Sequence, residues 1–366
     1  MTAPLLDLIT QRLVQDPPEA LQQELGETLY QQLFARCLSV PPAEPRHAAR
    51  INTIKSETTP RERALLFHLA SRFWNGQGHV LEVGPFLGGT TRALAMGMLE
   101  NPRRAADARL LTFDRFRAYY NGEALAQALE PQFQDGSLPS EARQMLTASG
   151  DFFEAFRLLH SSQDYWGLID ARVGVLPDLA ETPQTAETLA LPEDAAFGLV
   201  FVDGCKSWYA TRWFLARAMH QSLPGTVYAF QDYGWHTCFW IPFFLRAFRE
   251  DFRFLGRVDY THVFQLRSPR PVRDIEEAFP VSPEQAGIQA LETAFHELGI
   301  EALDRGDRET WTRHRLHTAA ARAYLGDTER AESLLRTLAE DEDLMRRCGR
   351  QIRLALEHPA YRPKGA

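Results

Sequence analysis

Short apolar runs alternate with amphipathic segments through the middle of the chain. Each run is five to ten residues long and rich in Val, Leu, Ile and Phe, and most runs end at a glycine or an acid. Such runs predict strands buried on both faces, and the segments between them have helical spacing. The pattern therefore predicts an α/β fold with a largely parallel sheet. The runs lie at residues 79–83, 110–114, 167–176, 197–203, 223–232, 252–258 and 260–266.

Both ends of the chain have purely helical periodicity. In residues 4–38 leucines recur at helical spacing on either side of Pro17-Pro18, which predicts a helical hairpin within an extension over residues 1–54. Residues 282–358 predict a few helices with turns at Gly306 and Gly326, a pattern similar to tetratricopeptide repeats but too short for a solenoid. Either extension could cover the sheet or contact a second copy of the chain, so a homo-oligomer formed through them stays open.

Composition narrows the classes of protein. With 366 residues and 45% apolar content, the chain can form one large domain and a smaller unit. A net charge of -8 argues against binding to nucleic acid or acidic membranes through bulk electrostatics. The four cysteines are scattered, and the sequence shows neither a leader pattern nor a membrane-spanning apolar run. We therefore expect a soluble cytoplasmic protein without nucleic-acid or membrane partners.

The segment from His79 to Ala95 predicts a strand, a glycine turn and a helix start. Gly84, Gly88 and Gly89 allow a tight turn close to a ligand, and the helix beginning near Thr90 offers free amides to an anion. A nucleotide-like ligand with a carboxylate or phosphate would fit there. The dinucleotide fingerprint Gly-x-Gly-x-x-Gly is absent, and the next strand-end acid, Asp114, lies thirty residues past Gly84, which disfavours a nicotinamide dinucleotide.

Four predicted strands end in an acid: Glu82, Asp114, Asp203 and Asp232. Ligands of open parallel sheets bind at the carboxyl ends of the strands, so we expect these four side chains to converge on one pocket.

The pattern Glu82-x-Gly84-x-x-x-Gly88-Gly89, followed by Asp114, resembles motif I and the acidic motif of class I S-adenosylmethionine (SAM) methyltransferases. The resemblance covers about residues 55–268 and implies a Rossmann-like seven-stranded sheet whose last strand is antiparallel. It implies SAM as the cofactor, with its carboxylate at Gly88, Gly89 and Thr90 and its ribose at Asp114.

The same resemblance implies roles for further residues, and for several of them a structural role is the alternative. Glu82 would hold the amino group of SAM or position the loop, and Phe86 would border the cofactor or belong to the core. Asp203 is also a candidate cofactor-binding residue. The segment from Lys55 to Thr58 would touch the ligands or only precede a helix capped by Thr59. The insertion at about 117–165 would form a lid or a surface elaboration.

The segment Asp203-Gly-Cys-Lys206 resembles metal-dependent O-methyltransferases of the catechol type and of the type that modifies sugars in antibiotic and polysaccharide pathways. The resemblance implies that Asp203 and Asp232 bind Mg²⁺ and that Lys206 is the general base. For Lys206 the alternative is a salt bridge to a strand-end acid, and His236 is the alternative base.

Two features of this segment leave choices open. The third metal ligand departs from the family pattern, so Gln231 and His236 are its candidates. Trp208 and Trp235, beside the acids, would bind a sugar ring or belong to the core.

These observations predict a SAM-dependent methyltransferase acting on a hydroxyl of a sugar or small specialised metabolite, with Mg²⁺ assistance as a hypothesis. N- or C-methylation is left open. The alternatives are a nicotinamide-dependent oxidoreductase and a catalytically degenerate cofactor fold that serves, with its helical tail, as a binding scaffold.

Overall fold

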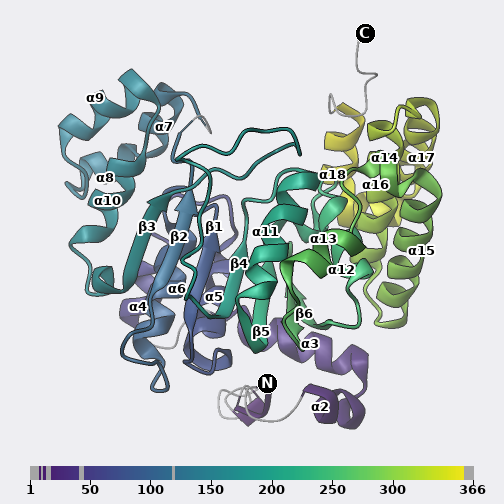
Figure 1. Cartoon of the computed structure of the whole chain (residues 1–366), viewed down its shortest axis with the longest axis horizontal. Coiled ribbons are helices and arrows are strands. Elements are labelled where there is room, and N and C mark those ends of the chain that lie inside the picture. The colour runs from purple at the N-terminus through teal and green to yellow at the C-terminus, as the bar shows by residue number, and fades with distance from the viewer. Residues whose placement is uncertain (1–7, 10, 14–17, 41–44, 118–119, 358–366) are drawn as a thin grey trace.

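The computed structural model describes residues 8–9, 11–13, 18–40, 45–117 and 120–357. Their centre is a seven-stranded sheet in the order β3-β2-β1-β4-β5-β7-β6 (Figure 1). The strands are β1 (His79–Val83), β2 (Leu110–Asp114), β3 (Ile169–Val173), β4 (Phe197–Val202), β5 (Ser222–Phe230), β6 (Phe252–Val258) and β7 (Thr261–Leu266).

Strand direction confirms the fold class. Strands β1 to β5 are parallel to one another, whereas β7 runs antiparallel to both β5 and β6. This is the Rossmann-like seven-stranded topology that the sequence predicted, and each of its seven strands lies within or beside one of the apolar runs.

Helices cover both faces of the sheet because successive strand residues point to opposite sides. Val80 and Leu199 belong to one core cluster, with residues of α3, α5 and α6, whereas Leu81 and Val200 belong to another, with residues of α11 and α12. The bounds are α3 (Glu27–Leu38), α5 (Pro60–His68), α6 (Gly89–Glu100), α11 (Trp208–His220) and α12 (Trp240–Ala247).

The predicted insertion folds into four helices with a core of their own. Phe116, Phe152 and Phe156 pack together there with Phe86 and Leu87 of the loop after β1. In Figure 1 these helices stand beside the β3 end of the sheet. They are α7 (Gly122–Ala128), α8 (Glu130–Gln134), α9 (Ser140–Ser149) and α10 (Phe153–Ser161).

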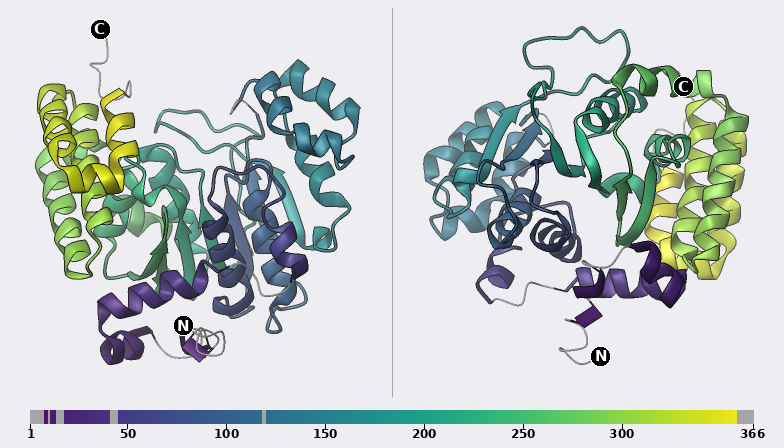
Figure 2. Two further views of the ribbon diagram at one scale, coloured as in Figure 1. Left: turned by 180° about the vertical axis from the view of Figure 1, so that it is seen from behind. Right: turned by 60° about the horizontal axis from the view of Figure 1, so that its bottom comes forward.

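The N-terminal helices α2 (Pro18–Leu25) and α3 lie under the sheet (Figure 2), followed by α4 (Pro45–Arg50). Phe34 of α3 packs where any side chain on Gly256 of β6 would stand, so this glycine permits the close approach. The start of the predicted hairpin, residues 4–7, and Pro17 lie outside the described residues.

The C-terminal helices stand at the other end of the sheet (Figures 1 and 2). Leu298 and Leu316 belong to the same core cluster as Phe244 of α12, so this extension continues the core of the sheet domain. The last residue of the predicted unit, 358, lies outside the described residues. The helices after the sheet are α13 (Val272–Ala278), α14 (Pro283–Ala286), α15 (Ile288–Asp304), α16 (Arg308–Tyr324), α17 (Thr328–Glu340) and α18 (Glu342–Glu357).

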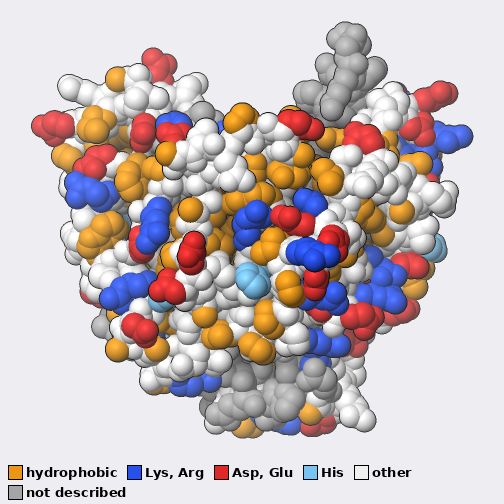
Figure 3. All heavy atoms as spheres, in the orientation of Figure 1, with side chains coloured by type: hydrophobic (Ala, Val, Ile, Leu, Met, Phe, Trp, Pro, Cys, Tyr) orange, Lys and Arg blue, Asp and Glu red, His pale blue; other side chains and the backbone are white. Residues whose placement is uncertain are grey.

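The surface adds little about partners. Acidic and basic side chains are interspersed on the face shown in Figure 3. Within the described residues, no helix combines the length and the apolar character needed to cross a membrane.

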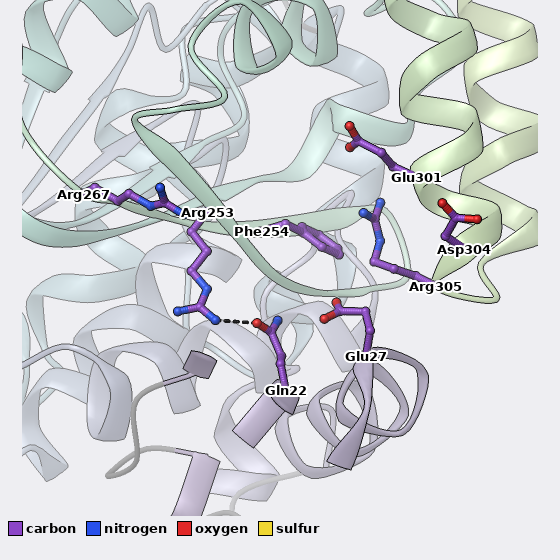
Figure 4. A pocket seen from close by; sticks show the side chains of 8 residues that line it. All are labelled: Gln22, Glu27, Arg253, Phe254, Arg267, Glu301, Asp304 and Arg305. Atoms are coloured by element: carbon purple, nitrogen blue, oxygen red, sulfur yellow. Dashed lines mark hydrogen bonds between the residues drawn. The ribbon is translucent and has the colours of Figure 1, made fainter. Parts of the chain in front are cut away.

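A hollow of about 440 Å³ lies between the N-terminal helices, β6 and α15 (Figure 4). It is at the edge of the sheet opposite the four acids, since Arg253 and Arg267 flank the start of β6 and the end of β7. Its three arginines are matched by three carboxylates, so the lining has no net charge to recognise an ion. The lining is Gln22, Glu27, Arg253, Phe254, Arg267, Glu301, Asp304 and Arg305.

Candidate active site

The four strand-end acids lie along one edge of the sheet. Val83 of β1 pairs with Phe113 of β2 and with Val202 of β4, which in turn pairs with Phe230 of β5. The carboxyl ends of these strands are therefore level. Glu82, Asp114, Asp203 and Asp232 stand at or just beyond those ends, as the sequence predicted.

Glu82 is fully buried and serves the loop. Its carboxylate accepts hydrogen bonds from the hydroxyls of Thr90 at 2.7 Å, Thr91 at 2.6 Å and Thr112 at 2.8 Å. Burial raises the pKa of this carboxyl, while the three hydroxyls act in the opposite direction. Glu82 thus joins β1 and β2 to the first turn of α6, which is the positioning role among the two predicted for it.

The Thr90 hydroxyl corrects one detail of the prediction. A hydroxyl has a single proton to donate, and that of Thr90 points to Glu82. The ligand carboxylate that the sequence assigned to this hydroxyl would therefore be bound by backbone amides. The first amides of a helix have no acceptor within it, and α6 begins at Gly89 after Gly88 without a side-chain cap.

The three glycines of the loop are required by neighbouring protein atoms. Gly84 and Gly88 have positive φ values, 86° and 87°. A Cβ on Gly84 would lie 2.8 Å from the backbone of Asp203, and one on Gly88 would overlap the ring of His160 in α10. A Cβ on Gly89 would lie 2.6 Å from that of Ser56. The loop is therefore enclosed by β4, by the insertion and by the segment before α5.

Asp114 fixes the two loops on either side of it. Its Oδ2 accepts from the amide of Phe86 at 3.1 Å and its Oδ1 from the amide of Phe116 at 2.9 Å. Both phenylalanines have a φ of 52°, an unfavourable value for a non-glycine residue. Burial raises the pKa of Asp114, and the two amides oppose that shift. Strained backbone held in place by the surrounding structure is typical of functional sites.

The insertion and the segment before α5 meet over this loop. The Phe86 ring centroid lies 5.7 Å from that of Tyr120, whose hydroxyl donates to Glu57 at 3.0 Å, and Glu57 pairs with Lys55 at 3.3 Å. Thr59 caps α5 and forms a reciprocal capping box with Glu62. The capping that the sequence predicted is confirmed, and Lys55 and Glu57 lie beside the glycine loop.

Lys206 lies between the two acids of the neighbouring strands. Its Nζ is 2.8 Å from Oδ1 of Asp203 and is also paired with Oδ2 of Asp232. Burial lowers the pKa of Lys206, but the two carboxylates outweigh burial and raise the pKa well above its ordinary value. Burial raises the pKa of Asp203 to about 7, although Lys206 acts against it. Lys206 is thus protonated at neutral pH here, the salt-bridge alternative, and its role as base stays a prediction.

The predicted metal site does not fit the donors present. Gln231, in the orientation that satisfies its amide, directs its nitrogen to Asp203 Oδ1 at 3.3 Å and to Asp232 Oδ1 at 2.8 Å. A side chain that donates to both carboxylates offers no oxygen to a cation between them. His236 is buried, with its ring 4.8 Å from that of Trp235. In the described part of the chain, no three His, Cys, Asp or Glu side chains are placed to hold a metal ion.

The tertiary structure decides between the two roles predicted for Trp208. Trp208 is buried, stacks on Phe279 with centroids 4.9 Å apart and donates to the carbonyl of Pro280 at 2.8 Å. It is a core residue. Trp235 is partly exposed beside Asp232.

Three positions important for the site were missed by sequence reasoning. His160 of α10 packs on Gly88, and Arg313 and His317 of α16 pack behind the turn that carries Asp232. Nothing in the local sequence distinguishes them, because the site residues that they contact, Gly88, Gly234 and Trp235, lie more than 70 residues away in the chain. Helical spacing predicted only that α10 and α16 have a buried face.

Comparisons with known proteins found solved structures that are distantly similar to this chain. No protein-family model and no curated protein matches the chain. Among solved structures, it is similar to the O-methyltransferase NovP, with 15% identity over 69% of this chain and 100% of that chain and a TM-score of 0.36. The cofactor-bound Rv0187 from MTB has 14% identity over 73% and 99% with a TM-score of 0.33. The O-methyltransferase from Bacillus cereus in complex with SAH has 15% over 68% and 97% with a TM-score of 0.30. At these values the likeness concerns the fold alone.

Proposed function

We propose that this protein is a SAM-dependent methyltransferase that acts on a hydroxyl of a small acceptor such as a sugar or specialised metabolite. The observation that carries the proposal is the environment of Asp114. This partly buried acid ends β2 and holds the glycine loop through Phe86, next to the start of α6. A carboxylate that can accept hydrogen bonds from two ribose hydroxyls, next to a helix start that can bind an anion, suits a ligand with a ribose and a carboxylate.

The chain can hold such a ligand with groups that the fold leaves available. Each Asp114 oxygen accepts one amide and retains a lone pair for a ribose hydroxyl. The amides that begin α6 suit the carboxylate of the ligand. When bound, SAM supplies an electrophilic methyl group on a sulfonium.

The acceptor side is assigned to the neighbouring strand ends. The amide of Asp203 donates to the carbonyl of Val83 at 2.9 Å, so its carboxylate starts directly beside the glycine loop. Asp232 and Lys206 follow along the edge, with about half of the Lys206 side chain exposed. In the transfer, the acceptor oxygen forms a bond to the methyl carbon and the carbon–sulfur bond breaks, returning its electron pair to sulfur. The hydroxyl proton passes to the carboxylate of Asp232.

Isothermal titration with S-adenosylhomocysteine (SAH) tests the cofactor assignment. We expect the full chain to bind SAH, and Asp114→Asn to weaken the affinity by about ten- to hundredfold, the range for losing one or two hydrogen bonds to a charged group. Asp170→Asn, an acid of β3 paired with Arg172, is the control and should bind as the parent does. Binding of NADH but not SAH would favour an oxidoreductase, and binding of neither would favour a scaffold.

A further inference from the structure

We infer that the ammonium group of Lys206 occupies the position of a divalent cation between Asp203 and Asp232, so that the acceptor site operates without a metal. The inference rests on the proposed methyltransferase function but concerns the other half of the site. The N–H donors around the two carboxylates, which do not suit Mg²⁺ as ligands, are the basis of this inference.

The first observation is geometric. Lys206 Nζ contacts an oxygen of each carboxylate, on side chains that are only 17% and 11% exposed. Two carboxylates this close repel each other unless a positive charge lies between them. The ammonium supplies that charge, in the place where a cation bridging the two acids would bind.

The second observation concerns the remaining oxygens. In the orientation that satisfies its amide, Gln231 donates from its nitrogen to Oδ1 of both aspartates, so both side chains that bridge the pair are N–H donors. A magnesium ion requires oxygen ligands at near-octahedral positions. Here the adjacent side chain presents hydrogen to the carboxylates where a third ligand would have to present oxygen.

The third observation comes from composition. The chain has three lysines, Lys55, Lys206 and Lys364, among its 40 basic residues, and the others are arginines. A guanidinium is a planar, extended group, whereas an ammonium is a compact charge. A lysine at 206, in a chain that otherwise uses arginine, suits a position that requires a compact charge.

The arrangement also gives Lys206 a contact with the acceptor. About half of its side chain is exposed, so the ammonium can donate to the acceptor oxygen while it pairs with the acids. It then orients that oxygen and stabilises the negative charge that develops as Asp232 takes the proton. Lys206 therefore acts as a cationic donor, whereas the sequence predicted a base.

Binding of Mn²⁺ tests the inference without knowledge of the acceptor. We expect the full chain, saturated with SAH, to show no specific Mn²⁺ binding by isothermal titration. In Lys206→Ala the two carboxylates lose their counter-charge, so Mn²⁺ should bind at least tenfold more tightly than to the parent. The additional change Asp232→Asn should abolish that binding.

A thermal measurement keeps the test informative if Lys206→Ala folds poorly. We expect MnCl₂ to raise the melting temperature of Lys206→Met by several degrees and to leave the parent unchanged. Lys55→Met removes a lysine from an exposed ion pair with Glu57 and should behave as the parent does.

Two results would overturn the inference: Mn²⁺ binding to the parent that is lost in Asp232→Asn, or no gain of Mn²⁺ binding in either Lys206 variant. Neither depends on the cofactor assignment, because failure to bind SAH in the same samples would contradict the proposed function alone.

Discussion

The Nε2 atom of His317 lies 2.9 Å from the carbonyl oxygen of Trp235. This contact joins α16 of the C-terminal extension to the turn that carries Asp232. On the same helix, Arg313 donates to the carbonyl of Asp259 at 2.9 Å, and a Cβ on Gly234 would lie 2.6 Å from its Nη1. Helix α16 therefore packs behind the turn that carries Asp232.

We expect His317→Ala to lower the free energy of unfolding by about 1–3 kcal/mol, because a fully buried imidazole and its hydrogen bond to the Trp235 carbonyl are lost. Chemical denaturation measures this change. His296 is exposed on α15, so His296→Ala should stay within about 0.5 kcal/mol of the parent. Equal effects of the two substitutions would show that the contact does not stabilise the fold.

The cost of His317→Ala should depend on pH. Burial lowers the pKa of His317 from 6.5 to about 3. As pH falls below about 6.5, the unfolded chain takes up a proton that the folded chain does not. The contribution of neutral His317 to the free energy of unfolding therefore decreases by about 1.4 kcal/mol for each pH unit below this value.

The difference between parent and variant isolates this effect, because Asp203, with its raised pKa, acts in the opposite direction in both proteins. We expect the difference in unfolding free energy to shrink by about 2 kcal/mol between pH 6.5 and pH 5. Denaturation series at pH 7, 6 and 5 measure it, and a constant difference would contradict the assignment of a neutral buried imidazole.

Gly88→Ala should destabilise the protein by more than the backbone strain alone. Gly88 and Gly136 both have positive φ values, 87° and 76°, so alanine at either position costs about 1–2 kcal/mol of strain. A Cβ on Gly136 meets no atom within 4 Å, whereas one on Gly88 would overlap His160. Comparing the two alanine variants by thermal unfolding separates strain from overlap. A Gly136→Ala variant less stable than Gly88→Ala would contradict the packing described here.

Thr112→Val tests whether Glu82 positions the cofactor loop. Valine has nearly the same shape and suits a strand, but it removes one of the three hydroxyls that bind the buried carboxylate. We expect a loss of stability of about 1–3 kcal/mol and weaker SAH binding, measured by thermal unfolding and titration. Thr112→Ser keeps the hydroxyl and should retain SAH binding. Equal SAH affinity in the two variants would show that the hydrogen bonds of Glu82 do not position the loop.

Sequence reasoning recovered what local patterns encode. The shared edge of the four strand-end acids could be predicted without knowing the strand order. Each acid ends an apolar run, and parallel strands have their carboxyl ends at the same edge of the sheet. The acids are Glu82, Asp114, Asp203 and Asp232. The capping box of Thr59 and Glu62 and the positive φ values of Gly84 and Gly88 were likewise predictable from a few adjacent residues.

The partners of the side chains were decided by the tertiary structure alone. Lys206 pairs with Asp232 across 26 residues, the Thr90 hydroxyl turns to Glu82, and Trp208 enters the core beside Phe279. Periodicity and motif spacing state which residue types lie on a strand end or a helix face. They do not state which donor reaches which acceptor, because that depends on packing between segments distant in sequence. For this protein, the sequence by itself determined the sheet and the edge that holds the site, and only the folded chain placed an ammonium group where a metal had been predicted.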